Sequence, residues 1–234
     1  MSEKKIVVPG EYLGLKGDRK TGSNVYSEED KVYSKKVGLL RESENSIDVV
    51  PLSGIYIPRK GDKIIGIIKE IQPSGWVVDI NSPYQAFLPL AEGVNEFVDV
   101  FRTDLSKYYD IGDVVYLKIL NIMKKKIIQL SIKDAGLRKL EDGILIKVTP
   151  TKIPRIIGRG GSMISMIKQK TKTNVIVGKN GIIWIKGRNT DKVLKAIELI
   201  EVKSHLSGLT EKISEFLDSY SQQKEGRGEK NEEA

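Results

Sequence analysis

Residues 156–164 read Ile-Ile-Gly-Arg-Gly-Gly-Ser-Met-Ile, so three glycines and an arginine separate two apolar pairs. The flanks have helical spacing, and the glycines predict a break between them. Glycine permits positive φ and leaves no Cβ in the way of an approaching backbone. A glycine-rich link that opens a helix also presents free N–H groups beside the positive end of the helix dipole. The stretch therefore predicts either an anion-binding site centred on Arg159 or a turn between two helices that needs glycine only for its bend.

The chain around this stretch alternates between strand and helix periodicity. Strands are expected at 144–148, 174–177 and 182–186, and helical segments at 153–157, 162–171 and 190–205. The resulting order is β-α-α-β-β-α. The last two strands are joined by the tight turn GKNG, which has Asn-Gly at its centre. Residues 210–220 are expected to add a final helix, and residues 221–234 are expected to be disordered because they lack an apolar pattern.

The first half of the chain is rich in short β-branched stretches separated by turn residues. Residues 61–133 contain five strand-like segments, which predict a small closed barrel. The dipeptides Gly61-Asp62 and Gly112-Asp113 are each interpreted as a turn that enters a strand. The fold class is therefore multidomain α+β. The expected domains are a β-rich domain at 1–60, a barrel at 61–135, the β-α-α-β-β-α domain at 136–209, and a C-terminal helix and tail at 210–234.

The net charge of +8 is unevenly distributed along the 234 residues. Residues 136–209 contain 15 basic and 5 acidic side chains, whereas residues 61–135 contain 9 and 10. The excess positive charge thus coincides with the segment that contains the glycine stretch. Such a concentration indicates a binder of polyanions, and a solvated lysine-rich surface is the alternative.

Composition excludes several classes of chemistry. The chain has no cysteine, which removes disulfides, thiolate metal sites and cysteine nucleophiles, and its only histidine is His205. The acidic residues of the barrel segment are scattered without a metal-binding pattern, and no GxxxxGK[ST] loop occurs. The N-terminus lacks a signal-peptide apolar region, and no apolar run is long enough to span a bilayer. We therefore expect a cytoplasmic, non-catalytic protein without metal or cofactor.

The stretch IIGRGGSMISMIKQKTKTNVIV resembles the core of a KH domain, an RNA-binding module whose GxxG loop clamps the backbone of about four nucleotides. The β-α-α-β-β-α order matches the type I topology of that family. The resemblance implies that Gly158 to Gly161 contact phosphates, with Lys152, Arg155, Lys168 and Lys172 flanking the groove. Ile156, Ile157 and Ile164 are expected in the core or the groove wall, and Trp184 is expected to be buried.

The preceding barrel resembles an S1 domain, an OB-fold RNA binder, on the residues GDKIIGIIKEIQPSGWVVDI, AFLPL and IGDVVYLKILNIMKKKIIQLSI. Two features depart from that family. The aromatic residue that the family usually has two positions after the turn glycine is replaced by Val77, and the stretch AFLPL lacks the histidine that is common in the middle strand. Base stacking on the usual platform is therefore in doubt. Trp76, Tyr84 and Phe87 are alternative stacking residues, with core roles as the competing interpretation. Arg102 and the lysines at 124–126 are alternative phosphate contacts, with a solvated basic turn as the competing interpretation.

Over residues 5–210 the chain resembles the S1/KH cap subunits of the archaeal exosome, on VVPGEYLG, PLSGIYIPRKGDKIIG and the GKNG that precedes IIWI. The resemblance implies a non-catalytic subunit that binds single-stranded RNA, with A-rich tails as a candidate class, and guides the 3′ end into a ring. In that family three caps, alone or with other cap subunits, sit on a hexameric ring of two RNase PH-like subunits, docked through the N-terminal domain. The candidate RNA-binding residues are Gly158, Arg159, Gly160, Gly161, Lys152, Arg155, Lys168, Lys172, Arg102, Lys124 and Lys125.

Two other functions stay open at this level. S1 and KH modules also occur together in transcription elongation factors, but these typically carry two KH domains and a helical N-terminal domain. A ribosome-associated RNA binder is a further alternative.

Overall fold

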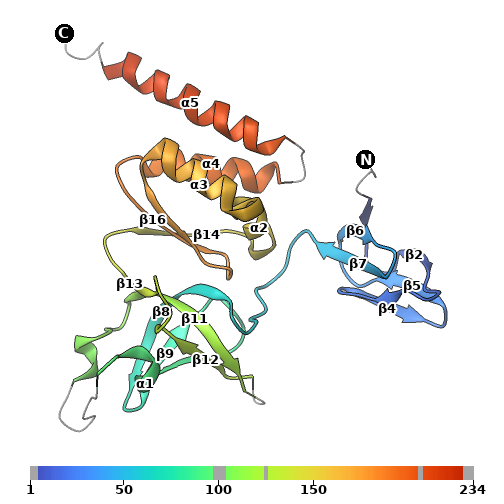
Figure 1. Cartoon of the computed structure of the whole chain (residues 1–234), viewed down its shortest axis with the longest axis horizontal. Helices are drawn as coiled ribbons and strands as arrows, with labels where there is room; N and C mark the ends of the chain where they lie inside the picture. The colour runs from blue at the N-terminus through green and yellow to red at the C-terminus, as the bar shows by residue number, and fades with distance from the viewer. Residues whose placement is uncertain (1–4, 97–103, 124–125, 205–207, 229–234) are drawn as a thin grey trace. The chain divides into compact units, whose positions relative to one another are not determined.

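The computed structural model describes residues 5–96, 104–123, 126–204 and 208–228, with side chains through residue 219. Its contacts divide the chain into two compact units, Met1–Ile55 and Tyr56–Ala234. Figure 1 shows β-sheet in the first unit, and a barrel followed by a helix-covered sheet in the second. The first unit is called the N-terminal unit below, and the two parts of the second are called the barrel and the helical module.

The N-terminal unit is built from two small sheets around one apolar core. The first sheet has the order β1-β6-β7-β3, formed by Ile6–Val7, Gly38–Glu42, Ser46–Pro51 and Lys20–Thr21. The second has the order β2-β5-β4, formed by Tyr12–Leu15, Lys31–Ser34 and Val25–Glu28. Alternating residues of both sheets point inward, and the buried core consists of Val7, Leu13, Val25, Val32, Ile47 and Val49. The unit therefore has a core of its own.

The barrel closes because its strand β12 pairs with strands on both sides. Its five strands are β8 (Lys63–Gln72), β9 (Gly75–Asp79), β10 (Ala86–Pro89), β11 (Val114–Ile122) and β12 (Ile128–Ser131). Strand β12 is parallel to β10 and antiparallel to β11, which completes the ring. The short elements α1 (Leu90–Gly93) and η1 (Leu105–Lys107) lie between β10 and β11, and β13 (Arg138–Leu140) pairs with β11. The predicted closed five-strand barrel is confirmed.

The helical module has the β-α-α-β-β-α order expected of a type I KH domain. Its sheet has the order β14-β16-β15, formed by Ile144–Lys147, Ile182–Lys186 and Asn174–Val177. Its helices are α2 (Ile153–Ile157), α3 (Ser162–Thr171), α4 (Thr190–Val202) and α5 (Leu209–Gly228), and the 3₁₀ turns η2 (Pro150–Lys152) and η3 (Arg159–Gly161) flank α2. Helices α2, α3 and α4 cover one face of the sheet (Figure 1), with Ile156, Ile167, Ile183 and Ile197 buried between the layers.

Helix α5 is longer than the sequence suggested. The expected helix ended at residue 220, but helical backbone continues through residues 221–228, part of the stretch predicted to be disordered. That stretch contains glutamine, lysine, glutamate and arginine, whose helix propensity is high, so an existing helix can extend through it. The first turns of α5 are fixed by tertiary packing, because Leu209, Ile213 and Leu217 are buried in the core of the module.

The barrel and the helical module are joined by the side chain of Asn180, in the turn between β15 and β16. This side chain is fully buried. Its Nδ2 donates to the carbonyl oxygens of Ile65 at 2.7 Å and Ile80 at 2.9 Å, and its Oδ1 accepts from the Ile65 N–H at 3.3 Å. The Gly181 N–H bonds to the Gly178 oxygen, so Lys179 and Asn180 are the central turn residues, and the prediction of Asn180-Gly181 at the centre was wrong. Asn180 therefore bonds the neighbouring barrel, a role beyond the turn chemistry that the sequence suggested.

Asp62 supports the same contact, and the interpretation of Gly61-Asp62 as a simple turn was incomplete. The carboxylate is 6% exposed and accepts from the Tyr56 hydroxyl and from Lys179 Nζ, each at 2.8 Å. Burial, followed by the hydrogen bond to Asp62, raises the pKa of Tyr56 above its usual value. Beside this polar cluster, buried side chains of both parts form an apolar contact made of Ile65, Leu140, Ile182 and Trp184. The expected burial of Trp184 is confirmed.

Replacing Asn180 with alanine should destabilise this junction. The change leaves buried backbone groups of Ile65 and Ile80 without their amide partner, so we expect the free energy of unfolding to fall by about 2–4 kcal/mol. Urea unfolding of the full chain measures it. Asn174→Ala is the control, because Asn174 is exposed on strand β15, and its effect should stay within about 0.5 kcal/mol. Equal effects of the two substitutions would contradict this role of Asn180.

Candidate nucleic-acid interface

The glycine loop between α2 and α3 uses each glycine for a physical reason. Gly158, Gly160 and Gly161 have φ of 78°, 58° and 82°, a region that other residues rarely adopt. A Cβ at Gly158 would lie 2.7 Å from the Cβ and the backbone N of Met163, whereas a Cβ at Gly160 or Gly161 would meet nothing within 4 Å. Gly158 thus serves packing. The other two glycines leave open space, in which another backbone can approach closely.

The loop also leads into helix α3 without a side chain that caps the helix. The Gly161 N–H bonds to the Gly158 oxygen, and the Ser162 N–H bonds to the Arg159 oxygen. Gly161 is the N-cap residue and has no side chain that could accept from the first turn of α3. Arg159 is exposed at the centre of the loop. The positive end of the helix dipole, which no side chain caps, and an exposed arginine are therefore combined in this loop, which suits a phosphate.

An apolar stripe that ends in a lysine runs along α3 from this loop. Gly161, Ile164 and Lys168 share one helix face because they are three and four residues apart. The side chains of Ile164 and Lys168 are half-buried. Burial lowers the pKa of Lys168. Helix α3 contacts β15, which is one of the two edge strands of the sheet.

The structure separates the predicted basic residues into distinct groups. Arg155 is exposed on α2, one turn before Gly158, and Lys168 lies on the stripe. Lys172 is exposed at the C-cap of α3, so the length of the ten-residue helix separates it from the loop. Lys152 Nζ lies 2.6 Å from the Ser204 hydroxyl, which holds this side chain against the end of α4. Arg155 and Lys168 thus lie within about two turns of the loop along their own helices, whereas Lys172 lies at the far end of α3 and Lys152 is hydrogen-bonded to Ser204.

Lys170 has a different role on the same helix. Its Nζ donates to the Ser214 hydroxyl at 2.7 Å and also pairs with the Asp218 carboxylate. Both partners belong to α5, so Lys170 ties α5 to α3. The predicted residues Arg102, Lys124 and Lys125 lie outside the described residues.

The burial and strand positions of the aromatic residues in the barrel show which of them can face a ligand. Trp76 is fully buried, and its Nε1–H donates to the Tyr109 oxygen at 3.0 Å, so the core interpretation holds for it. Tyr84 is half-buried and packs against the barrel core, with Lys126 Nζ 5.5 Å from its ring centre. Phe87 is half-buried, pairs with Val77 across β9 and β10, and alternates with the buried Ala86 and Leu88. Phe87 is therefore directed to the outside of the barrel wall.

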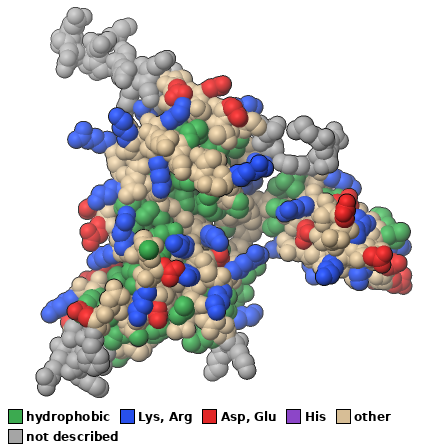
Figure 2. Space-filling view, viewed as in Figure 1, with side chains coloured by type: hydrophobic (Ala, Val, Ile, Leu, Met, Phe, Trp, Pro, Cys, Tyr) green, Lys and Arg blue, Asp and Glu red, His purple; other side chains and the backbone are tan. Residues whose placement is uncertain are grey.

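Figure 2 shows Lys and Arg side chains over the visible face of the barrel and helical module, with acidic side chains among them.

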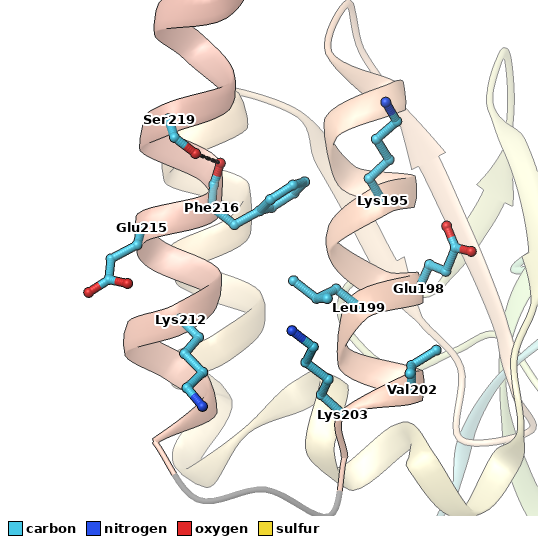
Figure 3. A pocket seen from close by; sticks show the side chains of 9 residues that line it. All are labelled: Lys195, Glu198, Leu199, Val202, Lys203, Lys212, Glu215, Phe216 and Ser219. Carbon is cyan, nitrogen blue, oxygen red and sulfur yellow. Dashed lines mark hydrogen bonds between the residues drawn. The ribbon is translucent and has the colours of Figure 1, made fainter.

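A groove of about 640 Å³ lies between α4 and α5, where Leu199 and Phe216 approach each other and Lys203 and Lys212 lie near one end (Figure 3). Within the described ranges, no group of three or more His, Cys, Asp or Glu side chains could hold a metal ion. Likewise, no described helix is long and apolar enough to cross a membrane.

Comparisons with known proteins agree with this arrangement. The family model of the exosome RNA binding protein RRP4 N-terminal domain matches residues 4–53, that of the S1 RNA binding domain matches residues 57–133, and that of the KH domain matches residues 143–191. A crystal structure assigned to an exosome complex RNA-binding protein is similar, with a TM-score of 0.67 and 30% identity over 73% of this chain and 99% of that one.

Curated relatives match nearly the whole chain. The protein of Methanothermus fervidus is 42% identical over 219 residues, which is 93% of this chain and 96% of the relative. That of Picrophilus torridus is 40% identical and covers 99% and 100% of the two chains. That of Thermoplasma volcanium is 43% identical and covers 97% and 93%. All three are named exosome complex component Rrp4.

Replacing Lys168 with methionine should separate binding from stability. Burial lowers the pKa of Lys168 below its value in the unfolded chain, so the buried charge costs stability at neutral pH. This cost disappears only as the pH rises through the lowered pKa toward the unfolded value. Lys168→Met should therefore leave the urea midpoint unchanged or raise it. RNA affinity should fall about threefold to tenfold, because one cation of the stripe is lost.

Lys170→Met on the same helix is the matched control. It should lower the urea midpoint, because it frees α5, and it should leave RNA affinity unchanged. Fluorescence anisotropy with single-stranded RNA and urea unfolding measure both properties. Undiminished RNA affinity in Lys168→Met would exclude the stripe from the interface.

Proposed function

The chain belongs to the Rrp4 family of exosome components, and we propose that it captures single-stranded RNA and guides the 3′ end toward the exonuclease of the complex. It is an RNA-binding subunit rather than a catalytic one. The transcription elongation alternative is not favoured, because the relatives over nearly the full chain are exosome components.

The observation that carries RNA binding is the glycine loop. Two glycines with open space around them, the uncapped start of α3 and an exposed arginine are combined in one small region. A phosphodiester backbone fits this combination, because each phosphate needs donors and positive charge but no base-specific contact. Binding through phosphates is largely independent of sequence, and its affinity falls with salt by a slope of about −0.7 per phosphate for single strands.

The finer architecture is also part of the proposal. Three copies of the chain, alone or with other cap subunits, would sit on a hexameric ring of two RNase PH-like subunits. Residues 1–60 would dock on the ring, the S1 barrel at 61–135 would surround the entry, and the KH domain at 136–209 would grip the RNA outside. A preference for A-rich RNA and a cytoplasmic location belong to the same proposal. Support comes from the three family models in this order and from the names of the relatives.

The double substitution Arg159→Asp/Gly160→Asp tests the glycine loop. It places negative charge where phosphates would bind, so RNA affinity should fall at least about tenfold. The fold should persist, because Arg159 is exposed, a Cβ at residue 160 meets nothing, and aspartate tolerates left-handed backbone. Fluorescence anisotropy of the full chain with single-stranded RNA at several salt concentrations measures the effect.

The control Gly208→Asp/Lys212→Asp makes the same change in charge and residue type elsewhere in the helical module. Gly208 has a φ of 66°, and its nearest neighbour to an added Cβ is Glu211 Oε2 at 3.7 Å. RNA affinity should change less than about threefold in this variant, since only long-range electrostatics are altered. If the two double variants bound RNA equally well, the loop would have no place in the mechanism.

The particle that contains the chain tests its assignment to the complex. A tagged full-length chain isolated from its own cells should recover a large assembly with RNase PH-like subunits, identified by native mass and by mass spectrometry. Recovery of RNA polymerase without such subunits would instead place the chain in transcription.

A further inference from the structure

Three tyrosines form a row across the outer face of the sheet β2-β5-β4 in the N-terminal unit. Tyr33 on the central strand is paired in register with Tyr12 on one side and Tyr26 on the other. The ring centres of Tyr12 and Tyr33 are 5.9 Å apart in an edge-on arrangement, and those of Tyr26 and Tyr33 are 5.4 Å apart and stacked. The three rings therefore touch one another across all three strands.

This row lies on the face turned away from the core. Leu13, Val32 and Val25 are the inward neighbours of the tyrosines on the three strands, and all are buried. Tyr12 is 47% exposed and Tyr26 is 37% exposed. Leu15 lies beyond Tyr12 on the same strand and is 57% exposed. The row and Leu15 together are called the tyrosine face below.

The tyrosine face is already ordered for binding. Each tyrosine has only two side-chain torsions to fix, and the mutual ring contacts restrict them further. A partner would thus lose little side-chain entropy on contact. Tyrosine is enriched at protein–protein interfaces, where its ring supplies apolar area and its hydroxyl supplies a hydrogen bond. The face matches that composition, since it joins three aromatic rings to an exposed leucine.

The charge of the N-terminal unit argues against RNA as the occupant. Residues 5–55 contain eight basic and eight acidic side chains, which gives no net charge. Residues 136–209 contain 15 and 5. Binding of nucleic acid depends on an excess of positive charge that displaces counterions, and the N-terminal unit has none. An exposed aromatic face on a neutral unit fits an apolar protein surface instead.

We infer that the tyrosine face docks the chain onto a protein subunit of the exosome through an apolar patch that also offers hydrogen-bond acceptors to the tyrosine hydroxyls. This inference rests on the proposed function, because it presumes that the chain joins such a complex. It assigns a surface to the docking step and leaves RNA binding to the barrel and the KH domain.

The variant Tyr12→Ser/Tyr26→Ser removes two exposed rings and leaves the half-buried Tyr33 in place. Tagged full-length chains, expressed in their own cells, are compared for recovery of exosome core subunits by quantitative mass spectrometry. Recovery with the variant should fall at least tenfold relative to the unsubstituted chain. Its RNA affinity should stay within twofold, and its urea transition should be retained. Leu15→Lys, a second and independent change on the face, should also reduce recovery.

Two controls separate loss of the rings from general disturbance of the unit. Tyr12→Phe/Tyr26→Phe keeps the rings and should retain most of the recovery. Ile6→Ser/Val50→Ser changes residues that are 59% and 45% exposed on the other sheet, and it should behave as the unsubstituted chain. Normal recovery of both Tyr12→Ser/Tyr26→Ser and Leu15→Lys would overturn the inference while leaving the proposed function intact. A parallel loss of RNA affinity would also overturn it, because the face would then contact RNA. Failure of the unsubstituted chain to recover core subunits would overturn both proposals.

Discussion

The amide of Asn180 is the interaction on which the arrangement of the RNA-binding parts depends. It satisfies backbone groups of two barrel residues, Ile65 and Ile80, that have no other partner on this side. Buried polar groups are costly when unpaired, so the amide and the barrel are stable only in contact with each other. Asp62 reinforces the contact with hydrogen bonds from both parts of the chain. The S1 barrel and the KH domain are therefore held together by buried hydrogen bonds.

This junction limits how the KH domain can bind RNA. The turn at Gly178–Gly181 connects strand β15, at one edge of the sheet, to the central strand β16. Its residue Asn180 is bonded to the barrel. The glycine loop, where RNA binding is proposed, instead begins helix α3. On that helix neighbouring lysines have separate tasks, since Lys170 fixes α5 whereas Lys168 remains on the stripe. The proposed RNA contact and the contact that stabilises α5 thus fall on residues two positions apart.

The N-terminal unit and the KH segment also differ in the kind of partner that is proposed for each. The KH segment carries the positive charge and the open glycines, which suit phosphates. The N-terminal unit is neutral and has its own core, and it exposes several aromatic and aliphatic side chains. A protein surface and an RNA strand make opposite demands on charge. Because the two proposed binding surfaces lie in separate compact units, one chain can meet both demands.

The sequence alone determined the order of the domains, the closed barrel, the β-α-α-β-β-α order and the glycine loop, because local periodicity and glycine positions specify these features. It also placed the excess charge. Only the tertiary structure decided which lysines were free, because Lys152 and Lys170 are engaged by residues far along the chain. Asn180 and Asp62 were interpreted as turn residues, since the partners of Asn180 in the barrel and the Lys179 partner of Asp62 are at least 100 positions away along the chain. The tyrosine row arises from strand pairing between three separate segments. Contacts of this kind depend on packing between distant segments, and no local pattern specifies that packing.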